Sequence, residues 1–327
     1  MSQGISWKGY LIRRIILVIP TILAVILINF SLIHLAPGDP ITLLTGTMEA
    51  SPEYIQAMTE KYGLDKSLPE QLVIFLSNIF RGDFGKSIKY DRPVLELIFS
   101  RLSATLLLMG TAVTLSIVIG LFLGIISARK PYSLTDNLAT SFSLFARSLP
   151  IFWLAQIILL LFAFYLGWFP TGGMTDLRHT YTGIAYVFDV LRHLFLPALT
   201  ICLLRMAVTA RLTRTSMIEV LSQDYIITAK AKGVSERRLL LKHALRNALR
   251  PVITITGISL GTIIAGATMT EIVFSWPGIG RLVYEAVLDR DYPILMGMYI
   301  FIALSIIIAN FITDIVYALY DPRVRYQ

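Results

Sequence analysis

Long apolar stretches alternate with polar segments along the 327-residue chain, and the apolar stretches predict its architecture. Each is close to the length of about 20 residues that a helix needs to cross the hydrocarbon core of a bilayer. The six stretches are Ile15–Leu35, Leu102–Ser127, Leu138–Leu166, His193–Ala210, Val252–Met269 and Ile294–Tyr317. The pattern therefore predicts an all-α polytopic membrane protein with six transmembrane helices.

Between the first two spans lies a polar segment, residues 36–101, that is long enough for a small helical insertion. Ser51 can cap a helix that has Pro52 in its first position and Gly63 just after its end. An amphipathic pattern predicts a second helix in LPEQLVIFLSNIF, residues 68–80. We expect the segment to form a partly helical cap.

Composition and charge agree with a membrane location. Hydrophobic residues make up 55% of the chain and charged residues 15%, whereas a soluble domain has about 25% charged residues. The net charge of +8 comes mostly from segments on the side of the N-terminus, so the positive-inside rule predicts a cytoplasmic N-terminus and C-terminus. The charge thus reflects orientation, and no nucleic-acid partner is expected. The single cysteine, Cys202, is expected in the core.

Two short motifs imitate functional signatures. RGDFGKS, residues 81–87, ends like a phosphate-binding loop, but Phe80 occupies the place of the first glycine and the segment falls on the outer side, so we expect a solvated turn. GISLG, residues 257–261, matches the G-x-S-x-G pattern of serine hydrolases but lies inside a predicted membrane helix, where small residues favour packing. Catalysis by Ser259 is kept as an alternative. The scattered histidines indicate no metal site.

Two arginines interrupt apolar runs. Arg147 stands in FARSLP and Arg205 in LLRMAV. Charged side chains inside membrane segments mark functional positions by default. Both residues either extend to the membrane boundary or line a polar route between helices, and the sequence leaves both options open.

The longest inner polar segment, residues 224–251, predicts a helix, a glycine turn and a second helix. The first helix covers residues 225–232, and Gly233 follows where a left-handed residue ends a helix. Ser235 can cap the second helix, with Glu236 near its positive end. That helix carries an apolar stripe and a basic row. The stripe is Leu241, Ala244, Leu245 and Ala248, and the row is Arg238, Lys242, Arg246 and Arg250.

This segment has two physical interpretations. It is either an interfacial helix pair attracted to anionic lipid headgroups or a docking element for another protein. In a docking element, the small residues Ala229 and Ala231 beside Gly233 would let a partner approach closely. Tyr225, Ile226, Lys230 and Lys232 would then anchor it.

Four stretches resemble the permeases of ABC importers, specifically the B-type permease of the dipeptide and oligopeptide family. TAKAKGVSERRLLLKHALRNALRPV is similar to the cytoplasmic coupling loop, although Ile227 and Thr228 replace the usual Glu-Ala opening. RRIILVIPTILAVILINFSLIHLAPGDP resembles the N-terminal span of that family. EIVFSWPGIGRLVYEAVLDRDYP resembles the outer loop before the last span, and DPRVRY resembles the C-terminal end. The resemblance covers essentially the whole chain.

The resemblance implies a type-1 ABC importer permease fold, an inner-membrane location in a prokaryotic cell, and half of a pathway for peptides. It implies three parts: an N-terminal helix with an extracytoplasmic insertion (1–101), a permease core (102–318) with its coupling loop at about 219–250, and a cytoplasmic tail (319–327). The residues implied to contact an ATPase are Tyr225, Ala229, Lys230, Ala231, Lys232, Gly233, Glu236 and Arg237.

The implied partners are a homologous second permease (C-type), two cytoplasmic ABC ATPases, an extracytoplasmic solute-binding protein and membrane lipid. The chain itself would be no enzyme and bind no cofactor, since ATP and Mg²⁺ would be held by the ATPase subunits. The insertion would receive the binding protein or cover the pore mouth, with a purely structural cap as the alternative. A secondary transporter, which would show internal repeats, and an intramembrane serine hydrolase are the rival classes.

Overall fold

The computed structural model describes residues 7–35, 53, 56, 59, 65–261, 263 and 267–320. Within these residues the regular elements are helices, together with one isolated β-bridge between Lys86 and Pro93. The chain forms two compact units. One comprises Met1–Leu102, Leu282–Phe311 and Ala318–Gln327, and the other comprises Ser103–Arg281 and Ile312–Tyr317.

The first unit contains the N-terminal helix and the helix that follows the insertion. Helix α1 is Trp7–Leu35. Helix α4 is Leu68–Phe80, so the amphipathic helix predicted for residues 68–80 is confirmed. The backbone N–H and the hydroxyl of Ser67 both donate to Glu70 at the start of α4, at 3.0 and 2.8 Å. The rings of Phe30 in α1 and Phe75 in α4 are 6.3 Å apart. Most of the helix predicted between Ser51 and Gly63 lies outside the described residues.

The same unit contains the last helix and the corner that precedes it. Helix α13 is Ile279–Leu288 and α14 is Tyr292–Tyr320. Asp291, in the corner between them, accepts hydrogen bonds from the Ser87 hydroxyl (2.6 Å), the Lys89 N–H (3.0 Å) and the Ile294 N–H (3.3 Å). The expectation that RGDFGKS forms a solvated turn is therefore wrong at Ser87, which is buried because it ties the loop to the start of α14.

The second unit is built around two long helices in close contact. Helix α5 is Val94–Arg129 and α8 is Gly183–Leu221. A Cβ on Gly120 would lie 2.6 Å from Cβ of Thr209, and one on Gly124 would lie 2.5 Å from Cβ of Thr213. Glycines four residues apart let two helix backbones approach this closely. The sequence analysis did not select this G-x-x-x-G pair.

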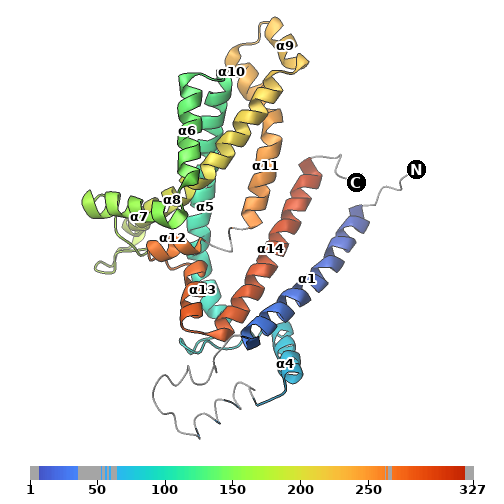
Figure 1. Cartoon of the computed structure of the whole chain (residues 1–327), viewed down its shortest axis with the longest axis vertical. Helices are drawn as coiled ribbons and strands as arrows, with labels where there is room; N and C mark the ends of the chain where they lie inside the picture. Colours follow the sequence, from blue (N-terminus) through green and yellow to red (C-terminus); the bar gives the residue numbers. More distant parts are fainter. Residues whose placement is uncertain are drawn as a thin grey trace. The chain divides into compact units, whose positions relative to one another are not determined.

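Helix α6 (Leu134–Ser148) packs along α8, and Figure 1 shows it in green beside α5. It is followed by α7 (Ile151–Ile158) and a π-helical segment, η1 (Leu159–Tyr165), bent by 105° from α6. The continuous helix predicted for Leu138–Leu166 is therefore interrupted between Ser148 and Ile151. Leu149 is extended, with ψ of 135°, because proline at position 150 disfavours a helical conformation in the residue before it.

The remaining helices of this unit are α9 (Asp224–Ala231), α10 (Glu236–Arg238), the π-helical η2 (Leu239–Ala244), α11 (Leu245–Gly261) and α12 (Thr268–Val273). Among the described residues, α5, α8 and α14 are long and apolar enough to cross a membrane, and the bent α6–α7 pair would make a fourth. Parts of α1 and of the stretch after α11 were not included when helices were judged long and apolar enough to cross a membrane. The count of six spans and the orientation stay predictions.

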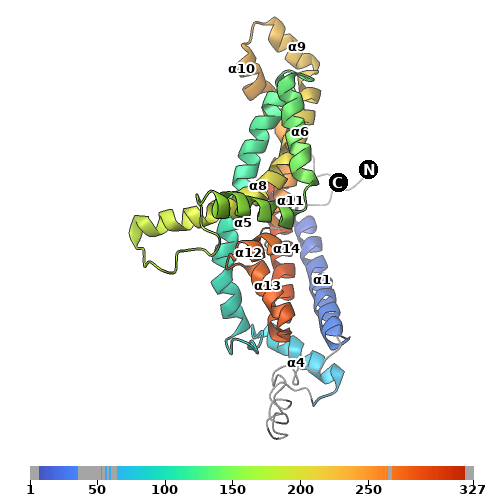
Figure 2. The ribbon, with the colours of Figure 1, turned by 60° about the vertical axis from the view of Figure 1, so that its left-hand side comes forward.

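Buried side chains fill the space between α5, α8 and the α12 region. The core there includes Leu108, Leu194 and Trp276, whose indole N–H donates to the Ala104 carbonyl at 2.9 Å. Cys202 is buried, as expected. Figure 2 shows α9 and α10 beyond the ends of α5, α6 and α8, away from α12. The segment predicted to dock a partner therefore lies at one end of this unit.

Candidate functional site

Helix α9 ends in the glycine turn that the sequence predicts. Gly233 has φ of +79°, and its N–H donates to the Lys230 carbonyl at 3.0 Å. The Val234 N–H donates to the Ala229 carbonyl at 3.2 Å, which closes the end of the helix. A Cβ placed on Gly233 would meet no atom within 4 Å. Glycine is therefore required here by backbone conformation, and not by close packing within the chain.

The second helix begins after Ser235, as predicted, but its buried face differs from the predicted stripe. Leu240, Ala244 and Ala248 are buried, whereas Leu241 is 47% exposed. The difference arises at η2, where a π-helical turn rotates the following residues relative to a regular α-helix. Helix α11 begins at Leu245 and continues through Pro251, so no new helix starts at Pro251.

One isoleucine fixes α9 to the rest of the unit. Ile226 is only 3% exposed and packs in a cluster with Met217, Leu240 and Ala244. The interpretation of Ile226 as an anchor for a partner protein is therefore wrong, because the side chain is used inside the chain. Neighbouring Tyr225 stays half exposed, and its hydroxyl accepts a hydrogen bond from the Asn247 amide at 2.8 Å.

An ion pair fixes the start of the second helix. The Arg129 guanidinium, at the end of α5, donates to both carboxylate oxygens of Glu236, with distances of 2.6 and 3.1 Å. The pair lowers the pKa of the Glu236 carboxyl below its usual value. Both side chains are more than half exposed, so the pair contributes orientation more than stability. Glu236 is therefore held within the chain, although it remains accessible.

The other residues predicted to contact an ATPase face outward. Tyr225, Lys230, Ala231, Lys232, Gly233 and Arg237 are exposed, and Ala229 is half-buried. The structure adds Ile227, which the sequence analysis did not select and which is 59% exposed. Its signal in the sequence was the pair of adjacent isoleucines, Ile226 and Ile227, because neighbouring residues point in different directions on a helix.

The two arginines selected from the apolar runs lie in different surroundings. Arg147 is exposed at the last turn of α6 and lines a cleft together with Arg211 and Arg214 of α8. Arg205 is half-buried in α8, and it is not among the described residues that line this cleft. The structure therefore does not bring Arg147 and Arg205 into one site.

A further ion pair, which the sequence analysis missed, joins α6 to α8. Asp136 is 1% exposed, and its two carboxylate oxygens accept from Arg214 Nε at 2.6 Å and from its terminal nitrogen at 2.7 Å. The Tyr132 N–H also donates to Asp136, at 2.8 Å. A buried carboxylate needs such partners.

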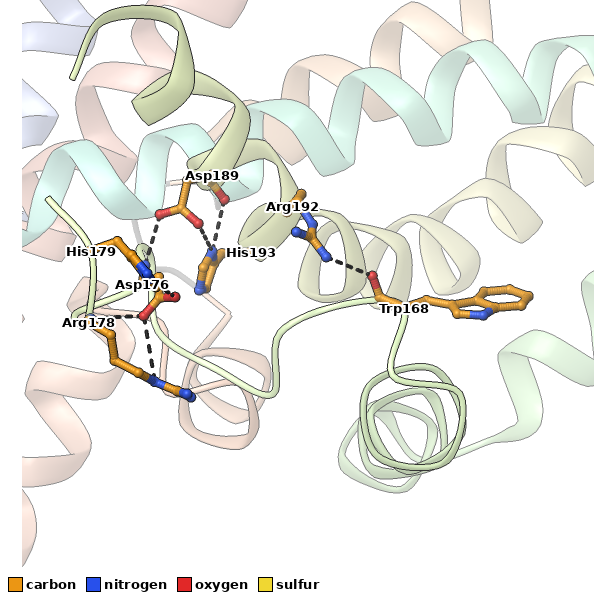
Figure 3. A network of polar contacts seen from close by, with 7 residues as sticks. All are labelled: Trp168, Asp176, Arg178, His179, Asp189, Arg192 and His193. Atoms are coloured by element: carbon orange, nitrogen blue, oxygen red, sulfur yellow. Dashed lines mark hydrogen bonds and ion pairs between the residues drawn. The ribbon is translucent and has the colours of Figure 1, made fainter. Parts of the chain in front are cut away.

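Polar contacts close the loop that precedes α8 (Figure 3). The Asp176 N–H donates to Asp189 at 2.8 Å, and Nδ1 of His193 lies 2.8 Å from the Asp189 carbonyl. Arg192 donates to the Trp168 carbonyl at 3.3 Å. Helix α8 begins at Gly183, ten residues before the predicted span, because its first turns belong to this polar network.

A buried carboxylate organises the EIVFSWPGIGR stretch. Glu271 is fully buried and accepts from the Thr105 hydroxyl and from the Arg281 N–H, both at 2.9 Å. The Thr105 hydroxyl also accepts from the Ile279 N–H at 2.8 Å. A Cβ on Gly278 would lie 2.2 Å from this carboxylate, so only glycine fits there. The stretch is therefore fixed to the middle of α5.

Family models match both parts of the chain. Residues 120–326 match the family described as the binding-protein-dependent transport system inner membrane component, and residues 8–109 match the family of the N-terminal part of such membrane components. The fold is similar to the MetNI methionine ABC transporter in its inward-facing form, with a TM-score of 0.55 and 16% identity over 69% of this chain and 97% of that chain.

Curated relatives align over nearly their whole lengths. The oligopeptide transport system permease protein AppB of Bacillus subtilis is 42% identical over 319 residues, which is 97% of this chain and 99% of the relative. The dipeptide transport system permease protein DppB of Escherichia coli K12 is 36% identical over 335 residues, with 97% and 99% coverage. These similarities favour a transport subunit over the hydrolase and secondary-transporter alternatives.

The helical structure and the family matches agree. The chain is a multi-pass bacterial inner-membrane protein and a transport subunit, not an enzyme. It belongs to the binding-protein-dependent transport system inner membrane components, among the dipeptide and oligopeptide permeases of ABC importers.

Proposed function

We propose that this chain forms half of the translocation pathway for peptides and that α9, the Gly233 turn and α10 receive the motion of a cytoplasmic ATPase. The observation that carries the proposal is the combination of rigidity and exposure in this segment. Ile226 and the Glu236–Arg129 ion pair hold it to α5, α8 and α11, while Tyr225, Ile227 and Lys230 face outward. Energetic coupling needs a firm element that can take two positions.

The exposed face suits a protein partner. It joins an aromatic residue and an isoleucine to lysines, and buried aromatic and aliphatic anchors with a charged rim are typical of docking surfaces. Since the chain has no complete phosphate-binding loop, the energy would come from partner chains that bind ATP and Mg²⁺. The partners we propose are two such ATPases, a homologous second permease and an extracytoplasmic solute-binding protein.

The proposed substrate class comes from the names of the relatives. The relatives named above are permeases for oligopeptides or dipeptides. We extend peptides as the substrate class to this chain. The insertion at residues 36–101 would receive the binding protein. Deleting residues 51–63 should then weaken binding-protein affinity and uptake, and unchanged values for both would instead assign the insertion a structural role.

Substitution of Gly233 tests the coupling role. Gly233→Val should remove transport and the stimulation of ATPase activity in the reconstituted importer, because a β-branched residue rarely adopts φ of +79°. Gly167→Val is the matched control, since Gly167 has φ of +62° and equally open surroundings after η1, outside the insertion. We expect the control to keep stimulation. Normal stimulation in Gly233→Val would refute the proposal, and membrane content of both variants is measured alongside.

A further inference from the structure

A small cleft opens between α5, α6 and α8, within the second unit. Its polar walls are Ser127 of α5, Thr140, Ser143 and Arg147 of α6, and Arg211 and Arg214 of α8. Alanines of both helices and Leu144 form the remainder of its α6 and α8 walls. None of the residues that line it is acidic. The cleft is therefore a cationic site that also has apolar lining residues.

The positive charge in the cleft is only partly balanced. Arg214 is paired with Asp136, which lies behind the wall. For the guanidinium groups of Arg147 and Arg211, no ion pair or hydrogen bond is found with the part of the chain that the structure describes. Two exposed guanidinium groups that converge on one cleft match the geometry of a phosphate group, which arginine binds with paired N–H donors.

A buried hydroxyl gives a second, independent indication of a ligand. The Ser143 side chain is 6% exposed and lines the cleft, and its Oγ has no hydrogen-bond partner among the described residues. A buried hydroxyl without a partner is unfavourable by about 1–3 kcal/mol. An anionic oxygen in the cleft would accept a hydrogen bond from this hydroxyl. The two arginines and the Ser143 hydroxyl are all hydrogen-bond donors, so an anionic acceptor would satisfy all three.

The surroundings indicate that the anion carries hydrocarbon. Leu144, on the α6 face that lines the cleft, is 53% exposed. In a membrane protein such a helix face contacts acyl chains or another apolar helix. A free zwitterionic peptide is a poorer match, because the cleft offers no carboxylate for its ammonium group.

The cleft also lies toward the end of α8 that leads into α9. Seven residues after Arg214, α8 ends at Leu221 and the chain enters α9. With the predicted orientation this is the cytoplasmic leaflet, where anionic lipids concentrate and where basic pockets between helices bind their headgroups. The placement rests on the proposed function, since that places α9 in the cytoplasm.

We propose that this cleft binds the phosphate of an anionic phospholipid from the cytoplasmic leaflet. The phosphate lies between Arg147 and Arg211 and accepts a hydrogen bond from Ser143, while the acyl chains leave the cleft past Leu144. The lipid thereby joins α6 to α8 beside the Asp136–Arg214 pair.

Photolabelling of the purified, complete importer in nanodiscs tests this. The probes are photoactivatable phosphatidylglycerol and photoactivatable phosphatidylcholine in a phosphatidylcholine bilayer, with labelled positions mapped by mass spectrometry. We expect phosphatidylglycerol to label α6 and α8 around the cleft, and phosphatidylcholine to label them weakly. Arg147→Gln with Arg211→Gln should lower labelling by phosphatidylglycerol about thirtyfold, since each cation near an anionic surface contributes about a factor of five.

Two controls separate charge from folding. Arg147→Lys with Arg211→Lys keeps the charges and should retain most of the labelling. Arg178→Gln removes an exposed arginine of the outer loop and should change nothing at the cleft. If the double glutamine variant fails to assemble, each single variant should still show about a fivefold loss.

Four outcomes would overturn the proposal. Equal labelling by the two lipids would show that the cleft does not select an anionic lipid. Labelling that the double glutamine variant keeps would show that the two arginines do not bind the lipid phosphate. Loss of labelling in excess inorganic phosphate would assign the cleft to free phosphate. A crosslink from Ser143→Cys to the second permease subunit would show that a protein covers it. None of these readouts depends on transport, so a failure of ATPase coupling at Gly233 would be distinguished from them.

Discussion

The buried carboxylate of Glu271 accepts a hydrogen bond from the hydroxyl of Thr105 at 2.9 Å, across 166 positions of sequence. The same hydroxyl accepts from the Ile279 backbone, so one threonine of α5 fixes both ends of the EIVFSWPGIGR stretch. This contact fixes the conformation of the segment before the last helix. The stability of the second unit should therefore depend on the Thr105–Glu271 pair.

Thr105→Val should therefore destabilise the protein by about 1–3 kcal/mol, because the carboxylate and the Ile279 N–H both lose a buried partner. Thermal unfolding of the purified importer measures the change. Thr114→Val is the matched control on the same helix, since its hydroxyl is bonded only to the Gly110 carbonyl at an exposed position. Equal shifts for the two variants would mean that the loss at Thr105 reflects helix propensity and not the Glu271 contact.

Gly124→Ala should destabilise the contact between α5 and α8. Its Cβ would lie 2.5 Å from the Thr213 Cβ and 2.7 Å from the Ala210 carbonyl oxygen, so the helices must separate. Overpacking of this kind costs about 1–3 kcal/mol. Gly110→Ala, on the same helix with no atom within 4 Å of the added carbon, should be neutral or stabilising in the same thermal assay. A stable Gly124→Ala variant would contradict the close approach.

Arg214→Gln should destabilise the protein more than Arg211→Gln. The first change leaves the buried Asp136 carboxylate without its bidentate partner, whereas Arg211 forms no ion pair with the described residues. Breaking a buried pair costs about 3–5 kcal/mol, and partial exposure of Arg214 reduces this to roughly 2–3 kcal/mol. Asp136→Asn combined with Arg214→Gln should recover part of the loss, and no recovery would show that the charges do not interact.

Reversal of the Arg129–Glu236 pair should affect coupling more than stability. Both side chains are more than half exposed, so Arg129→Glu alone should change the unfolding temperature little. The same variant should lower stimulated ATPase activity, because α10 loses its connection to α5. Combining it with Glu236→Arg should restore stimulation. If the single variant stimulates normally, the pair does not position the coupling segment.

Cysteine labelling tests the predicted orientation. The natural Cys202 is buried and should stay unreactive. Leu177→Cys, at a position 96% exposed, should react with an impermeant maleimide added to intact cells from the outer side of the inner membrane. Lys232→Cys, in the turn after α9, should react only after the membrane is permeabilised. The opposite pattern would place α9 outside the cytoplasm and remove the basis for coupling to an ATPase.

Residues near one another in sequence determined much of this protein. The apolar stretches marked the helices α5, α8 and α14, and Gly233 marked the end of α9, because periodicity, capping and a left-handed turn depend on a few neighbouring residues. The motifs in the coupling-type segment and before the last helix also indicated the family that the comparisons show.

Tertiary packing decided what the local pattern left open. The sequence showed two isoleucines in α9, but contact with Met217 and Leu240 decided that Ile226 turns inward and that Ile227 remains exposed. The π-helical turn at η2 replaced Leu241 by Leu240 on the buried face, since packing selects the rotation of a helix when several apolar residues compete.

The sequence also could not predict which polar side chains pair with each other. Thr105 and Glu271 are separated by 166 positions, and Asp136 and Arg214 by 78. Whether two polar side chains meet depends on how whole helices pack, and a local pattern holds no information on that. The sequence by itself determined the helices, the glycine turn and the family. Only the tertiary structure decided which charges are paired, which isoleucine is buried and where the arginines of α6 and α8 converge.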